Sequence, residues 1–95
     1  MARRFIYYLW VFANMQDEEI KKDIKSIFFE VFPKLSKNDF VWEKEQKDYD
    51  DWDSFAQLNI ITFAESKFDV SFSLDESIEI KSANDLLKCI SSHLK

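Results

Sequence analysis

Apolar residues recur at spacings of three and four in three separate stretches of the chain, which is the pattern of helices with one buried side. The first stretch predicts a helix over residues 16–32 that Pro33 ends, because the residue before proline avoids helical backbone angles. The others predict helices over residues 54–68 and 83–94. The three apolar stripes are Ile20, Ile24, Ile27, Phe28 and Val31; Phe55, Leu58, Ile61, Ala64 and Phe68; and Ala83, Leu86, Leu87, Ile90 and Leu94.

Helix-start signals precede the second helix and mark a further short one. Asp53 or Ser54 can cap the second helix by accepting hydrogen bonds from its free N–H groups. Gln57 lies three residues after Ser54, as a capping box requires. The sequence Ser-Leu-Asp-Glu at residues 73–76 has the same pattern, so we expect a short helix over residues 74–79.

Residues 33–53 predict a long loop between the first two helices. Phe40, Val41 and Trp42 can anchor it on the core, whereas residues 43–53 are highly polar. No stretch alternates regularly between apolar and polar residues, so a sheet is not expected. The sequence therefore predicts an all-α fold, a small four-helix bundle of three longer helices and one short helix.

The first fifteen residues differ from the rest of the chain. A basic start at residues 1–4 leads into an aromatic-rich apolar run over residues 5–13. This run is too short to cross a bilayer, which takes about 20 helical residues, and no convincing cleavage site follows it. We therefore divide the chain into an apolar extension, residues 1–15, and a helical domain, residues 16–95. A signal peptide or membrane anchor is the less favoured alternative.

Composition narrows the classes of function. The 95 residues suffice for one small domain, with 46% apolar and 17% aromatic residues for a core. A net charge of -5 argues against nucleic acid and favours partners that present Lys and Arg. The absence of Gly excludes Gly-rich phosphate loops. The single Cys excludes an internal disulfide and a Cys-based zinc site, and makes a cytoplasmic location the default expectation.

The residues around the second helix start resemble the acyl and peptidyl carrier proteins. Members of that family carry Asp-Ser-Leu there, and the serine bears 4'-phosphopantetheine; here the triplet is Asp53-Ser54-Phe55. Trp52 before it looks like stand-alone carriers of specialised pathways, where Trp-Asp-Ser is frequent. The resemblance covers roughly residues 17 to 95. It continues through Leu58-Asn59-Ile60-Ile61, Glu65-Ser66-Lys67-Phe68-Asp69-Val70, Phe72-Ser73-Leu74 and Ser82-Ala83-Asn84-Asp85-Leu86-Leu87.

The resemblance implies that Ser54 is the attachment site of 4'-phosphopantetheine, whose thiol holds an acyl or aminoacyl group as a thioester. Position alone predicts only a helix cap at this serine. A phosphodiester there suits the positive end of the helix. The implied partners are a phosphopantetheinyl transferase and the loading ligases, synthases or transferases of a fatty-acid-like, polyketide or other specialised pathway. The chain is expected to be a monomer and to catalyse no reaction itself.

The resemblance also implies an acidic docking surface for partner enzymes. The candidate partner-recognition residues are Asp51, Asp53, Phe55, Glu65, Asp69 and Glu76. An alternative of another class is a carrier-like adaptor that stays unmodified and binds basic proteins through the same surface. An independent small helical enzyme is disfavoured, because the sequence shows no acid/base pair, metal cluster or triad.

The remaining residues that could carry chemistry are expected to have no role in metal binding or catalysis. An EF-hand register starting at Asp48 fails, because its fifth position is Trp52 and its twelfth is Asn59, so no metal site is predicted. Cys89 lies among apolar residues of the last helix and is expected to fill the core, with no His and carboxylate set beside it. His93 is expected on the surface.

Overall fold

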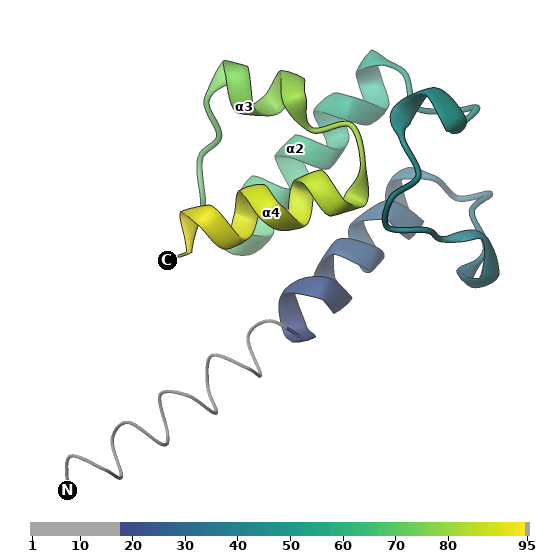
Figure 1. Cartoon of the computed structure of the whole chain (residues 1–95), viewed down its shortest axis with the longest axis horizontal. Helices are drawn as coiled ribbons and strands as arrows, with labels where there is room; N and C mark the ends of the chain where they lie inside the picture. The colour runs from purple at the N-terminus through teal and green to yellow at the C-terminus, as the bar shows by residue number, and fades with distance from the viewer. Residues whose placement is uncertain (1–17, 95) are drawn as a thin grey trace, which may run out of the picture.

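The computed structural model describes residues 18–94, which form a small all-α bundle (Figure 1). Among these residues there are four α-helices, three longer and one short, as the sequence predicts. They are the N-terminal helix, whose described part covers residues 18–31, and helices α2 (Ser54–Phe68), α3 (Leu74–Glu79) and α4 (Ala83–His93). In the view of Figure 1, α3 lies above α4, and the long loop lies at the opposite end of the bundle from the C-terminus.

Capping residues set the ends of the helices. Ser73 and Glu76 form the predicted capping box of α3, in which each side chain accepts from the other residue's backbone N–H. The Ser82 hydroxyl accepts from the backbone N–H of Asp85 at the start of α4. At the end of α2, Asp69 takes a left-handed conformation with φ 54°, which a short polar side chain tolerates better than most.

The loop between the first helix and α2 is ordered by its aromatic side chains. It contains two short 3₁₀ turns, Lys37–Asp39 and Gln46–Asp48. Phe40 and Trp42 are partly buried against the core, which confirms their expected anchoring role, whereas Val41 is 48% exposed. The loop's backbone also meets the start of α4, because Glu45 and Ser82 form an isolated antiparallel bridge.

All three long helices contribute side chains to the core. Its largest fully buried side chains come from the N-terminal helix, α2 and α4. They are Ile24, Ile27, Phe28, Ile60, Leu86 and Ile90. The predicted stripes of the N-terminal helix and α4 are therefore mostly correct. Leu94 is the exception at 44% exposed, because α4 ends at His93 and leaves it beyond the last turn.

The predicted buried side of α2 is correct at Ile61 and Ala64 but wrong at Phe55 and Leu58. Phe55 is 79% exposed and Leu58 is 61% exposed, while Phe68 is only partly buried. The residues that α2 does bury are Ala56, Ile60, Ile61 and Ala64. Both sets fit helical spacing and share Ile61 and Ala64. The buried side is rotated toward Ala56 and Ile60, and the small side chains of its two alanines let α2 lie close to its neighbours.

No helix among residues 18–94 is both long and apolar enough to cross a membrane. The apolar extension predicted at residues 1–15 lies outside the described residues.

Candidate functional site

Ser54 occupies the first position of α2, and the residue is exposed to solvent. The N-cap is Asp53, with extended backbone angles and a side-chain Oδ1 that accepts from the backbone N–H of Ala56 at 2.9 Å. The sequence leaves Asp53 and Ser54 open as capping residues, and the structure assigns this role to Asp53. No described residue makes a hydrogen bond with the Ser54 hydroxyl. This oxygen is therefore accessible at the helix N-terminus, where a phosphate group is favoured.

Gln57 does not complete a capping box at α2, contrary to the prediction from its spacing. Its side-chain oxygen accepts from the indole N–H of Trp52 at 2.6 Å. Its amide nitrogen donates to the backbone oxygens of Ser77 at 2.6 Å and Ile80 at 3.0 Å. Gln57 therefore joins three segments: the loop before Ser54, the first turns of α2 and the end of α3. The sequence gives no sign of this link, because it depends on how α3 lies against α2.

Replacing Gln57 with leucine is expected to destabilise the fold by about 1–3 kcal/mol, because the partly buried indole N–H and two carbonyls lose their partner. For a domain of this size the melting temperature is then expected to fall by about 5–15 °C. Thermal unfolding followed by circular dichroism measures the change. The exposed Asn59, two residues along α2, supplies the control Asn59→Ala, for which about 0.5 kcal/mol or less is expected. Equal losses in both variants would contradict a structural role for the Gln57 contacts.

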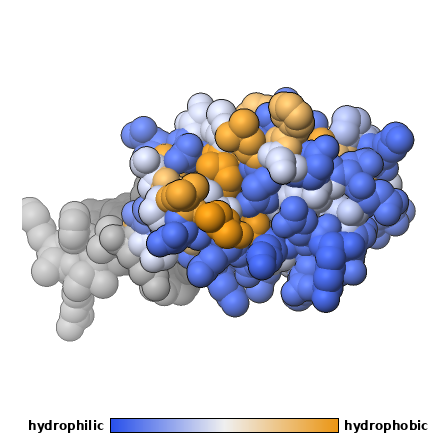
Figure 2. All heavy atoms as spheres, turned by 90° about the horizontal axis from the view of Figure 1, so that it is seen from above, coloured by the Kyte–Doolittle hydropathy of each residue, from blue (hydrophilic) through white to orange (hydrophobic). Residues whose placement is uncertain are grey.

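Two apolar side chains that follow Ser54 on α2 are exposed, and so are two on α3. Phe55 and Leu58 follow Ser54 on α2, and Leu74 and Ile78 of α3 are 76% and 60% exposed. Spacings of three and four place the members of each pair on one side of their helix. Figure 2, the view from above Figure 1, shows hydrophobic side chains gathered on this face of the molecule. We call these four residues the apolar patch. An exposed group of this kind is typical of a surface that contacts another molecule.

The candidate partner-recognition residues separate into two groups along α2. Asp51, Asp53 and Phe55 are exposed at its start, beside Ser54. Glu65 and Asp69 lie at the other end, about 17–22 Å along the helix axis at 1.5 Å per residue. Glu65 is also engaged within the fold, since its Oε2 accepts from the backbone N–H of Phe72 at 2.8 Å. The structure therefore brings only the first group together with Ser54.

Glu76, the remaining candidate, turns toward α4 and meets Cys89 and His93. Its Oε2 lies 2.8 Å from the His93 Nε2 and 3.5 Å from the Cys89 Sγ. The backbone N–H of Ser73 and the His93 side chain lower the pKa of Glu76 to about 2. Burial, and then the Glu76 carboxylate, raise the pKa of Cys89 to about 11. The expectation that Cys89 has no His and carboxylate beside it is therefore wrong.

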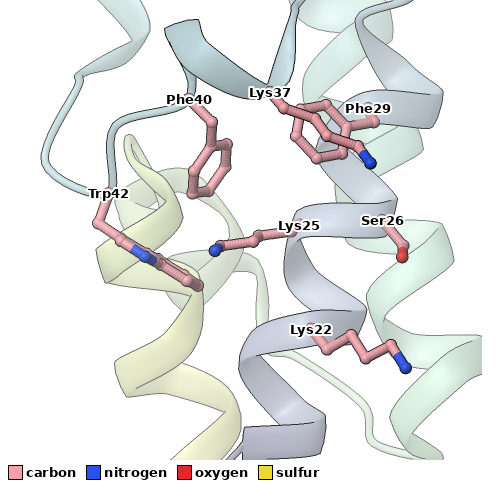
Figure 3. A pocket seen from close by; sticks show the side chains of 7 residues that line it. All are labelled: Lys22, Lys25, Ser26, Phe29, Lys37, Phe40 and Trp42. Atoms are coloured by element: carbon pink, nitrogen blue, oxygen red, sulfur yellow. The ribbon is translucent and has the colours of Figure 1, made fainter.

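A hollow of about 520 Å³ lies beside the N-terminal helix and the long loop, and none of its lining residues comes from α2 (Figure 3). Phe29, Phe40 and Trp42 supply its apolar walls, and lysines surround them. Figure 3 shows Lys25 reaching toward Trp42. Its Nζ lies 5.8 Å from the centre of the Phe40 ring and 6.0 Å from that of the Trp42 ring. These cation–π contacts explain the position of Lys25 and give it a structural role, because they connect the N-terminal helix to the loop.

The start of α2 thus combines an accessible hydroxyl with a helix N-terminus, and the apolar patch is formed by α2 together with α3. The sequence predicts Ser54, Asp53 and Phe55 as candidate residues here but does not predict the contribution of α3. Comparison of the chain with protein-family models, with curated proteins and with solved structures finds no match.

Proposed function

We propose that this chain is a discrete carrier protein that is modified on Ser54 with 4'-phosphopantetheine and holds an acyl or aminoacyl group on that arm. The observation that carries the proposal is the exposed Ser54 hydroxyl, which no described residue engages, at the first position of α2 within Asp53-Ser54-Phe55. A serine that served only as a helix cap would direct its oxygen to the helix N–H groups. Here Asp53 has that role.

The surroundings of Ser54 suit both the modification and a partner enzyme. A phosphodiester on its oxygen lies at the positive end of α2, where backbone N–H groups and the helix dipole favour negative charge. The apolar patch offers a contact surface for an enzyme that must reach this oxygen. The exposed carboxylates of Asp51 and Asp53 favour approach by a basic enzyme surface.

In the proposed modification the Ser54 oxygen forms a phosphodiester with the pantetheine phosphate of coenzyme A. The pyrophosphate bond of coenzyme A breaks, adenosine bisphosphate leaves, and the hydroxyl proton passes to the transferase or to water. The terminal thiol of the arm then carries the cargo as a thioester. The protein itself catalyses no step, and presents the tethered cargo at a high effective concentration to loading and processing enzymes.

The proposal is tested by incubating the purified chain with coenzyme A and a broad-specificity phosphopantetheinyl transferase and measuring its intact mass. The expected result is one added phosphopantetheinyl group on most of the protein. A known carrier protein in the same reaction shows that the transferase is active. If several active transferases add nothing, the proposal is wrong and the unmodified adaptor that binds basic proteins is favoured instead.

A further inference from the structure

Three side chains with different donor atoms meet where α3 lies against α4, away from Ser54. Cys89 and His93 are four residues apart, so they share one side of α4. Glu76 of α3 lies opposite them. The Glu76 oxygen, the Cys89 sulfur and a His93 ring nitrogen all lie within 4.8 Å of one another. The side chains of His93 and Glu76 remain 27% and 37% exposed, so the cluster is open to solvent.

The orientation of these side chains is fixed by groups that take no part in the cluster. One Glu76 oxygen, Oε1, accepts from the backbone N–H of Ser73 at 2.9 Å in the capping box of α3. The other oxygen, Oε2, is thereby directed toward Cys89 and His93. The His93 ring lies against Phe72, with ring centres 5.4 Å apart. Supports of this kind orient metal ligands in known sites.

Two of the three separations are close to those of a tetrahedral zinc site, and the third, between the Cys89 sulfur and a His93 ring nitrogen, is within 4.8 Å. Zn–N and Zn–O bonds of about 2.0–2.1 Å and a Zn–S bond of about 2.3 Å place the ligand atoms about 3.3–3.6 Å apart. The distance from the Glu76 oxygen to the Cys89 sulfur is already 3.5 Å. The distance from that oxygen to the His93 nitrogen is 2.8 Å, so it must lengthen by about 0.5 Å to reach the zinc separation.

We propose that Glu76, Cys89 and His93 bind one divalent transition-metal ion of the Zn²⁺ class, with the fourth coordination position left to water or another ligand. Thiolate, imidazole and carboxylate are the ligands that Zn²⁺ takes in proteins. The single Cys excludes sites made of several cysteines, but a mixed set needs only one. A hollow of about 310 Å³ lined by Glu76 and Cys89, and also by Glu79, Asp85 and Lys88, gives an ion a route in from solvent.

Binding replaces the hydrogen bonds among the three side chains with bonds to the metal, and the Cys89 thiol releases its proton to solvent. The ion joins α3 to α4, and α3 carries Leu74 and Ile78 of the apolar patch. Metal binding therefore holds that part of the patch in place. The site does not depend on modification of Ser54.

The test uses the full chain without an affinity tag, kept reduced, and titrates it with Co²⁺. The expected result is binding of one ion per chain, with the sulfur-to-cobalt charge-transfer absorption and the strong visible bands of tetrahedral Co²⁺, followed by displacement with Zn²⁺. Cys89→Ser is expected to lose the charge-transfer absorption, and His93→Gln and Glu76→Gln to weaken binding at least 10-fold. Asp75→Asn removes a neighbouring carboxylate of α3 outside the cluster and is expected to bind as the parent does.

A second measurement is independent of the spectrum. At a Zn²⁺ concentration about 100-fold above the dissociation constant, the melting temperature is expected to rise by about 10 °C or more. The rise is expected to disappear in Cys89→Ser and to remain in Asp75→Asn. Failure to bind Co²⁺ and Zn²⁺ would overturn the proposal. So would a spectrum that Cys89→Ser leaves unchanged, or equal weakening in Asp75→Asn, which would indicate binding by surface charge alone.

Discussion

Replacing Ser54 with alanine is expected to abolish addition of phosphopantetheine completely, with no mass increase after a reaction that modifies the parent protein. The substitution removes the oxygen that forms the phosphodiester. It is not expected to disturb the fold, because the side chain is exposed and no described residue bonds to its hydroxyl. The free energy of unfolding is expected to change by about 0.5 kcal/mol or less. Intact mass and thermal unfolding, measured on the same samples, separate loss of the attachment site from loss of structure.

The matched control for this prediction is Ser66→Ala. Ser66 is an exposed serine on the same helix, twelve residues beyond Ser54 and near its other end. This variant is expected to gain one phosphopantetheinyl group as the parent does. A mass increase that persists in Ser54→Ala would assign the attachment to another residue. Loss of modification in Ser66→Ala would show that the transferase recognises residues of α2 beyond its first turn.

The sequence predicted where the helices begin and end because those signals are local. Asp53, Ser73 and Ser82 each accept a hydrogen bond from a backbone N–H three residues later, and such contacts depend on nearby residues alone. Pro33 and Asp69 mark ends for equally local reasons. The location of Ser54 at the start of α2 could be predicted in the same way.

The features that the sequence did not reveal depend on contacts between distant segments. Trp52 lies in a polar stretch, yet it is only 5% exposed because the aromatic residues of the loop and the N-terminal helix surround it. Gln57 has the spacing of a capping residue but bonds to α3. Glu76 meets Cys89 and His93 only because α3 lies on α4. None of these contacts follows from periodicity or capping.

The orientation of α2 determines whether Phe55 belongs to the core, as its helical spacing predicts, or to a contact surface, as its exposure in the structure indicates. The structure gives an unambiguous contrast with Phe28, a residue of the same type that is fully buried. The centre of the Phe28 ring lies 5.5 Å from that of Trp52 and 5.8 Å from that of Phe40. These contacts connect the N-terminal helix to the loop that leads to Ser54.

Phe28→Ala is therefore expected to destabilise the protein by about 3–5 kcal/mol, the usual cost of removing a buried aromatic ring. This is a large part of the roughly 5–15 kcal/mol by which natural domains are stable, and corresponds to a fall of about 15–30 °C in melting temperature. Phe55→Ala is expected to change stability by about 0.5 kcal/mol or less, because the ring is already in water. Thermal and urea unfolding measure both variants.

If Phe28→Ala does not fold, Phe28→Leu provides a milder loss for the same comparison with Phe55→Leu. A substantial loss in the Phe55 variant, equal to that of its Phe28 counterpart, would mean that α2 buries the side defined by Phe55, Leu58 and Phe68. In that case Phe55 and Leu58 do not belong to the apolar patch, and the contact surface proposed for partner enzymes is reduced to Leu74 and Ile78 of α3. A large loss at Phe28 together with none at Phe55 supports the orientation of α2 described here, and leaves Phe55 available for contact with an enzyme that reaches Ser54.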